Sequence, residues 1–143
     1  MGFVSLVGVV MIALGATVAS ADTATTNIHV TTTAAADQPA CRHAASKDAT
    51  AMVSSSSSQW VLTIKANAPI CEPVTAAIYA MPNNVFWPWP QQKVESTTFD
   101  VPAGTTTITF TKTCWANLGD VVTGATPERI QSTTGPMHGP LLF

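Results

Sequence analysis

The most reactive side chains in this 143-residue chain are three cysteines and three histidines. Cys41 and His43 lie two positions apart, and a thiolate with an imidazole suits zinc or copper. A structural zinc site needs four ligands, however, and no other cysteine or histidine lies near this pair in the sequence. We therefore expect a cysteine that holds no metal beside a solvated histidine, and no cofactor.

These side chains do not form a recognisable catalytic set. A serine hydrolase needs a nucleophile, a base and an orienting acid, but the serines cluster at 54–58 and the histidines His29, His43 and His138 lie in flanking segments. A thiol enzyme built on Cys41 would lack the group that orients the base. No glycine-rich phosphate loop occurs either. We predict that the protein is not an enzyme.

The odd number of cysteines leaves one without a partner inside the chain. Cys71 opens a strand-like segment and Cys114 closes another, so we predict a disulfide between them that closes a loop of about 43 residues and contributes about 4 kcal/mol. Cys41, in a polar stretch, is then the free or intermolecular thiol. The alternative pairing of Cys41 with Cys71, which would bury Cys114, stays open.

The segment 86–90, Phe-Trp-Pro-Trp-Pro, is the most distinctive candidate binding loop. Prolines stiffen it, and the rings of Phe86, Trp87 and Trp89 are large flat faces that suit a sugar ring or a protein partner. Two prolines spaced by one residue also exclude a central strand. We favour the competing interpretation, in which these aromatic rings fold back over an open edge of the domain as part of its core.

The N-terminus predicts export. An apolar run over 3–15 is too short to span a bilayer. The residues at 19–21, Ala-Ser-Ala, are small, as signal peptidase requires of the residues just before its cleavage position. We predict a signal peptide over 1–21 with cleavage after Ala21, and no stable membrane span once it is removed. Only 10% of residues are charged and the net charge is −2, without a basic stripe, so we exclude nucleic-acid binding.

Two regions are expected after the signal peptide. Residues 22–58 are rich in Thr, Ala and Ser and bury little apolar area, so they predict a flexible linker, with one edge strand where Ile28 and Val30 alternate with polar residues. Residues 59–143 are expected to form the ordered domain.

Several short strands are expected in this domain. Alternating apolar residues from Trp60 onward predict the first strand. Four more are expected over 74–81, 95–101, 105–114 and 118–123, separated by proline and glycine turns. This spacing predicts an all-β, antiparallel, immunoglobulin-like β-sandwich, in which Trp60 and Trp115 are core residues placed to pack on the disulfide.

The second half of the chain carries a family resemblance. The matching stretches are Ala77 to Pro82, Trp87-Pro88 with Gln91-Gln92, Thr107 to Lys112 before Cys114, Asp120 to Pro127, and His138 to Phe143. From Ala76 onward the chain resembles small secreted or wall-associated proteins of actinobacteria, some of which end in a Leu-Pro-x-Thr-Gly sorting signal. The resemblance implies an immunoglobulin-like domain and an extracellular or envelope location, but no activity. No such signal follows here, so the protein is either released or continues beyond Phe143 as a longer chain.

These observations favour a non-enzymatic accessory module, secreted or held in the cell envelope, that acts in adhesion or binds an extracellular glycan or protein through loops of the sandwich. The alternative is a carbohydrate-binding domain that uses Trp87 and Trp89. A further alternative is an inhibitor of an extracellular enzyme, with the Pro-Trp-Pro loop as a rigid wedge.

Overall fold

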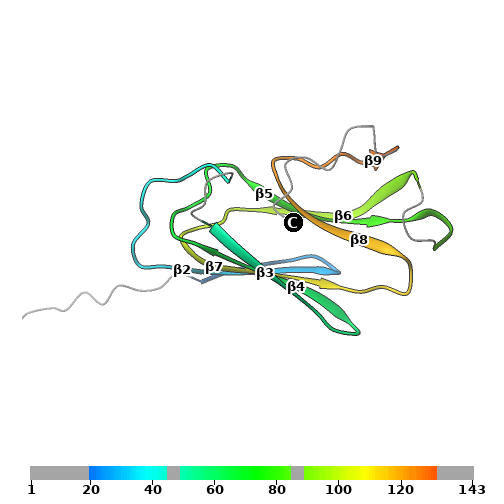
Figure 1. The fold of residues 1–143 in the computed structure, drawn as a ribbon, viewed down its shortest axis with the longest axis horizontal. Helices are drawn as coiled ribbons and strands as arrows, with labels where there is room; N and C mark the ends of the chain where they lie inside the picture. The colour runs from blue at the N-terminus through cyan, green and yellow to red at the C-terminus, as the bar shows by residue number, and fades with distance from the viewer. Residues whose placement is uncertain (1–19, 45–48, 85–88, 132–143) are drawn as a thin grey trace, which may run out of the picture.

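The computed structural model describes residues 20–44, 49–84 and 89–131, which form two antiparallel sheets packed face to face (Figure 1). The first sheet has the order β1-β2-β7-β4-β3, with β1 (Ser20–Ala24), β2 (Ile28–Ala34), β7 (Gly104–Thr111), β4 (Gln59–Ala66) and β3 (Ala49–Ser55). The second has the order β8-β5-β6-β9, with β8 (Asn117–Thr123), β5 (Val74–Ala80), β6 (Gln91–Phe99) and β9 (Arg129–Ile130). The predicted all-β fold, an antiparallel β-sandwich, is confirmed.

Helical structure is minor in the part of the chain described above. It consists there of one short 3-10 turn, η1 (Pro82–Asn84). None of these residues belongs to a helix of the length and hydropathy needed to cross a membrane.

The strands of the first sheet follow the predicted alternation of side chains. In β4, Leu62 and Ile64 are buried, and in β7 Ile108 and Phe110 are buried on the same face. The opposite face is rich in threonine, and Thr107 pairs there with a threonine of β2 and another of β4. Since branched side chains fit a pleated surface, this polar face accounts for much of the threonine in the composition.

The predicted flexible linker over 22–58 is wrong for three stretches, which form β1, β2 and β3. The strand expected near Ile28 exists, but it lies between β1 and β7 and is not an edge. Ile28 and Val30 are 0% and 1% exposed because the second sheet covers them. β3 pairs along its whole length with β4. A composition argument misses β3 because its partner's backbone, and not its own apolar area, holds it in place.

The main core fills the space between the sheets, and a second cluster lies on the other face of β5. The first contains Ile28, Val30, Leu62, Ile64, Ala66, Ile70, Val74, Ala76, Ile78, Phe99, Val101, Ile108, Phe110 and Val121. The second contains Ala77, Tyr79 and Ile130, with Trp89 and Leu118 packed against them. The hydroxyl of Tyr79 donates to the carbonyl of Pro127 at 2.8 Å, so the segment leading to β9 covers this outer face. β5 is therefore buried on both sides.

Candidate functional site

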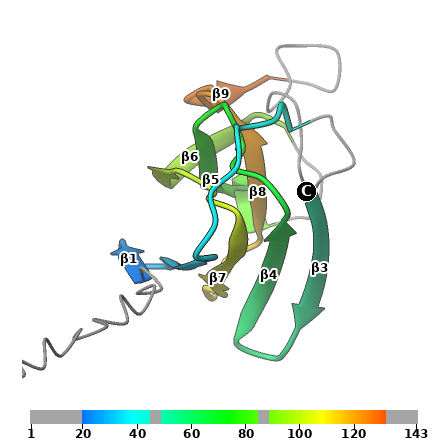
Figure 2. The same ribbon diagram turned by 90° about the vertical axis from the view of Figure 1, so that its left-hand side faces the viewer.

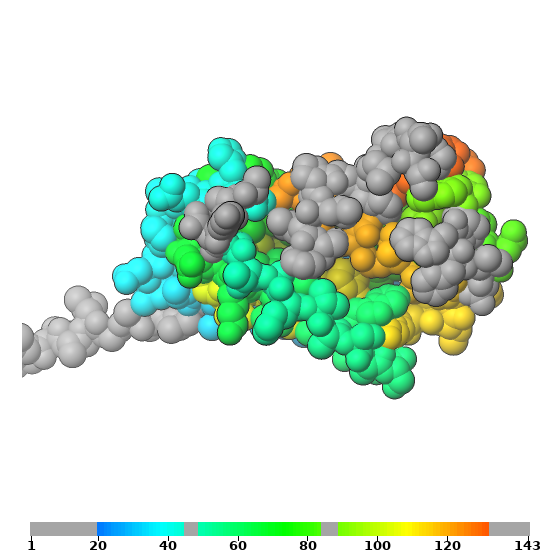
Figure 3. All heavy atoms as spheres, viewed as in Figure 1, coloured from blue at the N-terminus to red at the C-terminus, as the bar shows by residue number. Residues whose placement is uncertain are grey.

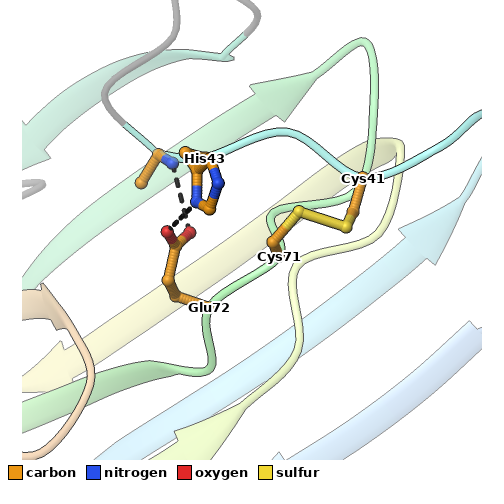
Figure 4. Close-up of a disulfide and its surroundings, with 5 residues drawn as sticks. Cys41, His43, Cys71 and Glu72 are labelled. Carbon is orange, nitrogen blue, oxygen red and sulfur yellow. Dashed lines mark hydrogen bonds and ion pairs between the residues drawn. A yellow bond between two sulfur atoms is a disulfide. The ribbon is translucent and has the colours of Figure 1, made fainter.

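The disulfide of the structure joins Cys41 to Cys71, whose Cα atoms lie 5.0 Å apart (Figure 4). The predicted Cys71–Cys114 bond is therefore wrong. Cys71 follows the end of β4 at Ala66, whereas Cys114 follows the end of β7 that lies beside Gln59. The eight residues of β4 span about 26 Å, far beyond the reach of a disulfide. The pairing found is the alternative that the sequence left open, but Cys114 is free and exposed, so the burial expected for it with that pairing is wrong.

Backbone contacts bring Cys41 and Cys71 together. Arg42 forms a parallel bridge with Ile70, its N–H donates to the carbonyl of Pro69 at 2.7 Å, and the N–H of Cys71 donates to the carbonyl of Arg42 at 3.0 Å. The loop that follows β2 is thus fixed against the loop that precedes β5. The disulfide staples two loops and does not cross the core.

His43 and Glu72 form a second link between the same two loops. Their side chains are hydrogen-bonded, and the backbone N–H of Ala44 donates to the other oxygen of Glu72 at 3.3 Å (Figure 4). The hydrogen bond with His43 lowers the pKa of the Glu72 carboxyl. The side chain of His43 is 81% exposed. Because the sulfur of Cys41 is bonded to Cys71, Cys41 and His43 cannot act together as metal ligands, and the described residues contain no cluster of three potential ligands.

The predicted aromatic binding loop lies partly outside the described residues, which include neither Phe86 nor Trp87. Trp89 is half-buried and packs against the cluster that contains Tyr79 and Ile130, as the favoured interpretation expects for this ring. The inhibitor hypothesis depends on the same loop and stays a prediction.

The two other tryptophans lie near the end of the sandwich opposite the disulfide. Trp60 is partly buried and packs against the main core, whereas Trp115 is 71% exposed. The prediction of a core position is therefore wrong for Trp115, and neither ring packs on the disulfide. The reason is that residues 112–116 follow the end of β7 that pairs with Gln59, and this end of the sheet is the one far from Cys71.

Ala21, the predicted cleavage position, lies in β1 opposite Thr32. A chain beginning at Asp22 would keep three of the five residues of this strand and their pairing with β2. The cleavage itself stays a prediction.

An apolar cleft lies between the two sheets where β3 and β4 meet β8, and its volume is about 440 Å³. Figure 2 shows the β3–β4 hairpin extending past β8, and both β3 and β8 reach the surface on the face drawn in Figure 3. The lining residues are Val53, Trp60, Leu62, Phe110, Asn117, Leu118, Gly119 and Val121. This is the candidate functional site.

The cleft exists because β3 has no strand opposite it in the second sheet, where β8 is the edge strand. Val53 pairs with Leu62 and shares its inward face, yet Val53 is 60% exposed. Gly119 widens the opposite wall, since a Cβ atom there would lie 3.4 Å from the ring of Phe110. A strip of the sandwich interior is thus left open to solvent.

Polar groups lie next to two of the lining residues, Trp60 and Asn117. The ammonium group of Lys112 lies 5.0 Å from the centroid of the Trp60 ring and donates to the hydroxyl of Ser55 at 2.9 Å and to the carbonyl of Ser56. The amide of Asn117 donates to the hydroxyl of Thr113 at 2.7 Å. None of the lining residues is acidic, histidine or cysteine.

This arrangement is suited to binding a small, largely apolar ligand. A volume near 440 Å³ and a mostly apolar wall with a few polar groups are typical of small-molecule sites. The sequence did not reveal this site, because the composition around Val53 predicts a linker. The only local signal was a short apolar stretch from Ala51 to Val53, and because Met52 is itself apolar it shows no alternation that would separate a strand from a loop.

Comparisons with protein families, with curated proteins and with solved structures found no match to this chain.

Proposed function

We propose that this protein is an exported, non-enzymatic binding module that takes an apolar part of its ligand into the cleft between β3–β4 and β8. The observation that carries the proposal is the open strip of sandwich interior that Val53, Trp60 and Phe110 line. The disulfide between two surface loops supports an oxidising compartment, because such bonds persist outside the reducing cytosol.

The energetics favour a modest affinity. Each methylene group that enters the cleft contributes about 0.8 kcal/mol, so six contribute about 5 kcal/mol before the entropy cost of association. The ring of Trp60 offers a rigid contact face, which loses little entropy on binding. Because −5 kcal/mol corresponds to a dissociation constant of roughly 0.2 mM, we expect weak binding unless a longer chain enters the cleft.

Neighbouring residues of β3 provide a matched test. Val53 and Met52 are 60% and 65% exposed and point to opposite sides of the sheet, Val53 toward the cleft. A neutral fluorescent probe, N-phenyl-1-naphthylamine, is titrated into the purified protein and its emission is recorded. We expect Val53→Asp to abolish the enhancement and Met52→Asp to leave it unchanged. Equal behaviour of the two variants, or no enhancement with the wild type, would contradict the proposal.

Glycan binding is a second candidate function, and one observation favours it. Trp115 presents an indole that is 71% exposed, which is the kind of face on which sugars stack. Trp89, by contrast, is half-buried against the outer cluster. On a glycan array we expect Trp115→Ala to remove binding without loss of stability. Trp89→Ala is expected to lower the melting temperature, and glycan binding that survives Trp115→Ala would rule out this use of the indole.

A further inference from the structure

We infer that the ligand of this cleft is a single-chain aliphatic carboxylate, with its chain along Trp60 and its carboxylate at Lys112. This inference depends on the proposed function, because it names the class of ligand for the same cleft. Charge complementarity at one end of an otherwise apolar site carries it.

The position of Lys112 places its charge at the cleft. Phe110 points into the sandwich, and in an extended chain a residue two positions further lies on the same side. The side chain of Lys112 accordingly crosses over Trp60, with its ammonium group 5.0 Å from the centroid of the ring. Its other contacts, with Ser55 and Ser56, hold it beside the inner face of the β3–β4 hairpin.

The charge of Lys112 has no carboxylate partner among the described residues. The ion pairs found there join His29 to Asp22, His43 to Glu72, and Lys93 to Glu128. Both acceptors of Lys112 are neutral oxygens, from a hydroxyl and a carbonyl group. An ammonium group has three donors, so beside these two hydrogen bonds and the contact with the Trp60 ring one N–H is left for an anion at this end of the cleft.

The apolar wall extends away from this end. Asn117, which lies near the polar end, and Val121 are four positions apart along β8, or about 13 Å. A chain of medium length matches this distance. The volume of about 440 Å³ suits one chain better than the two chains of a membrane lipid. A cationic amphiphile would place like charges together at Lys112, which disfavours binding.

The test compares ligands that share a chain and differ in charge. Dodecanoate, dodecanol and dodecyltrimethylammonium, each below its micelle-forming concentration, compete with N-phenyl-1-naphthylamine for the wild-type protein. We expect dodecanoate to bind about five- to tenfold more tightly than dodecanol, and the cation to bind most weakly. Added salt should lower the affinity for dodecanoate and leave the affinity for dodecanol unchanged.

Two lysine variants locate the charge. Lys112→Met keeps the aliphatic stem and should reduce the affinity for dodecanoate to that of dodecanol. Lys65→Met, on the exposed opposite face of β4, is the matched control and should change neither affinity. Should Lys112→Met fail to fold, as judged by its thermal transition, the charge and salt series with the wild type decides the question.

The outcomes separate the two proposals. Equal affinities for the three ligands would overturn the inference and leave the proposed function intact. If none of the three ligands displaces the probe, both proposals are overturned. Binding to phosphatidylglycerol vesicles without binding to monomeric dodecanoate would also overturn the inference, because it would assign Lys112 to a membrane surface.

Discussion

Removal of the Cys41–Cys71 disulfide should destabilise the protein by an amount that follows from its loop. The bond joins residues separated by 30 positions, and closing a loop of that length lowers the entropy of the unfolded chain by the equivalent of about 3.6 kcal/mol. For a domain of this size, about 4 °C of melting temperature corresponds to each kcal/mol. We therefore expect the double variant Cys41→Ser/Cys71→Ser to melt about 14 °C below the wild type.

The assay is thermal unfolding followed by circular dichroism, with urea unfolding at 25 °C as a second measure. Cys114→Ser is the control, and we expect it to melt with the wild type because Cys114 is free and exposed. Without reduction, one of the three cysteines should react with an alkylating reagent, and peptide mapping should place the label on Cys114. A double variant within about 2 °C of the wild type, or a Cys114→Ser variant that melts as low, would refute the assignment.

Three further predictions concern single side chains, each measured by urea unfolding. Burial raises the pKa of the Glu95 carboxyl, but hydrogen bonds from the β1–β2 turn outweigh this and lower it below 4.5. The ionised Glu95 carboxylate therefore stabilises the fold above pH 4.5, and this stabilisation is lost as the pH falls through the pKa of Glu95 in the folded protein. Glu95→Gln should therefore lower the free energy of unfolding by about 1 kcal/mol at pH 7. If the difference in this free energy between variant and wild type does not shrink between pH 5 and pH 3, the stabilisation does not come from the ionised carboxylate. Gly104→Ala should cost about 3 kcal/mol, since φ is 127° there and a Cβ atom would lie 2.3 Å from the carbonyl oxygen of Thr33. Gly124→Ala, at φ 80° in open space, should cost only about 1 kcal/mol, and equal losses would argue against the clash. Tyr79→Phe removes a 2.8 Å hydrogen bond and should lower the free energy of unfolding by about 1 kcal/mol. An unchanged free energy of unfolding would show that this hydrogen bond does not stabilise the fold.

Local patterns were sufficient to predict most strands of the second half of the chain. The alternation around Leu62 and Ile108 has a period of two over many residues, and proline or glycine ends each run, so β4 and β7 could be placed from their own residues. β2 and β3 could not be placed with the same success. Their short apolar stretches became strands because β7 and β4 supply hydrogen-bonding partners that lie far away in the sequence.

The candidate site was out of reach of the sequence analysis for a related reason. Val53 lies beside a run of serines, and nothing local shows that the second sheet ends before it covers β3. Lys112 was likewise one scattered cation among six Lys and Arg residues. Its proximity to Trp60 depends on the pairing of β7 with β4.

The fold class could be read from local features, since side-chain periodicity and turn residues act over a few neighbouring positions. Which cysteines meet, which tryptophan is exposed and where the sandwich stays open depend instead on how the strands pair in space. Cys71 and Cys114 each adjoin a strand, but only the antiparallel pairing of β4 with β7 shows that they lie at opposite ends of the sandwich. Disulfides and clefts depend on distances in space, and these are set by the order and register of strands that are distant in sequence.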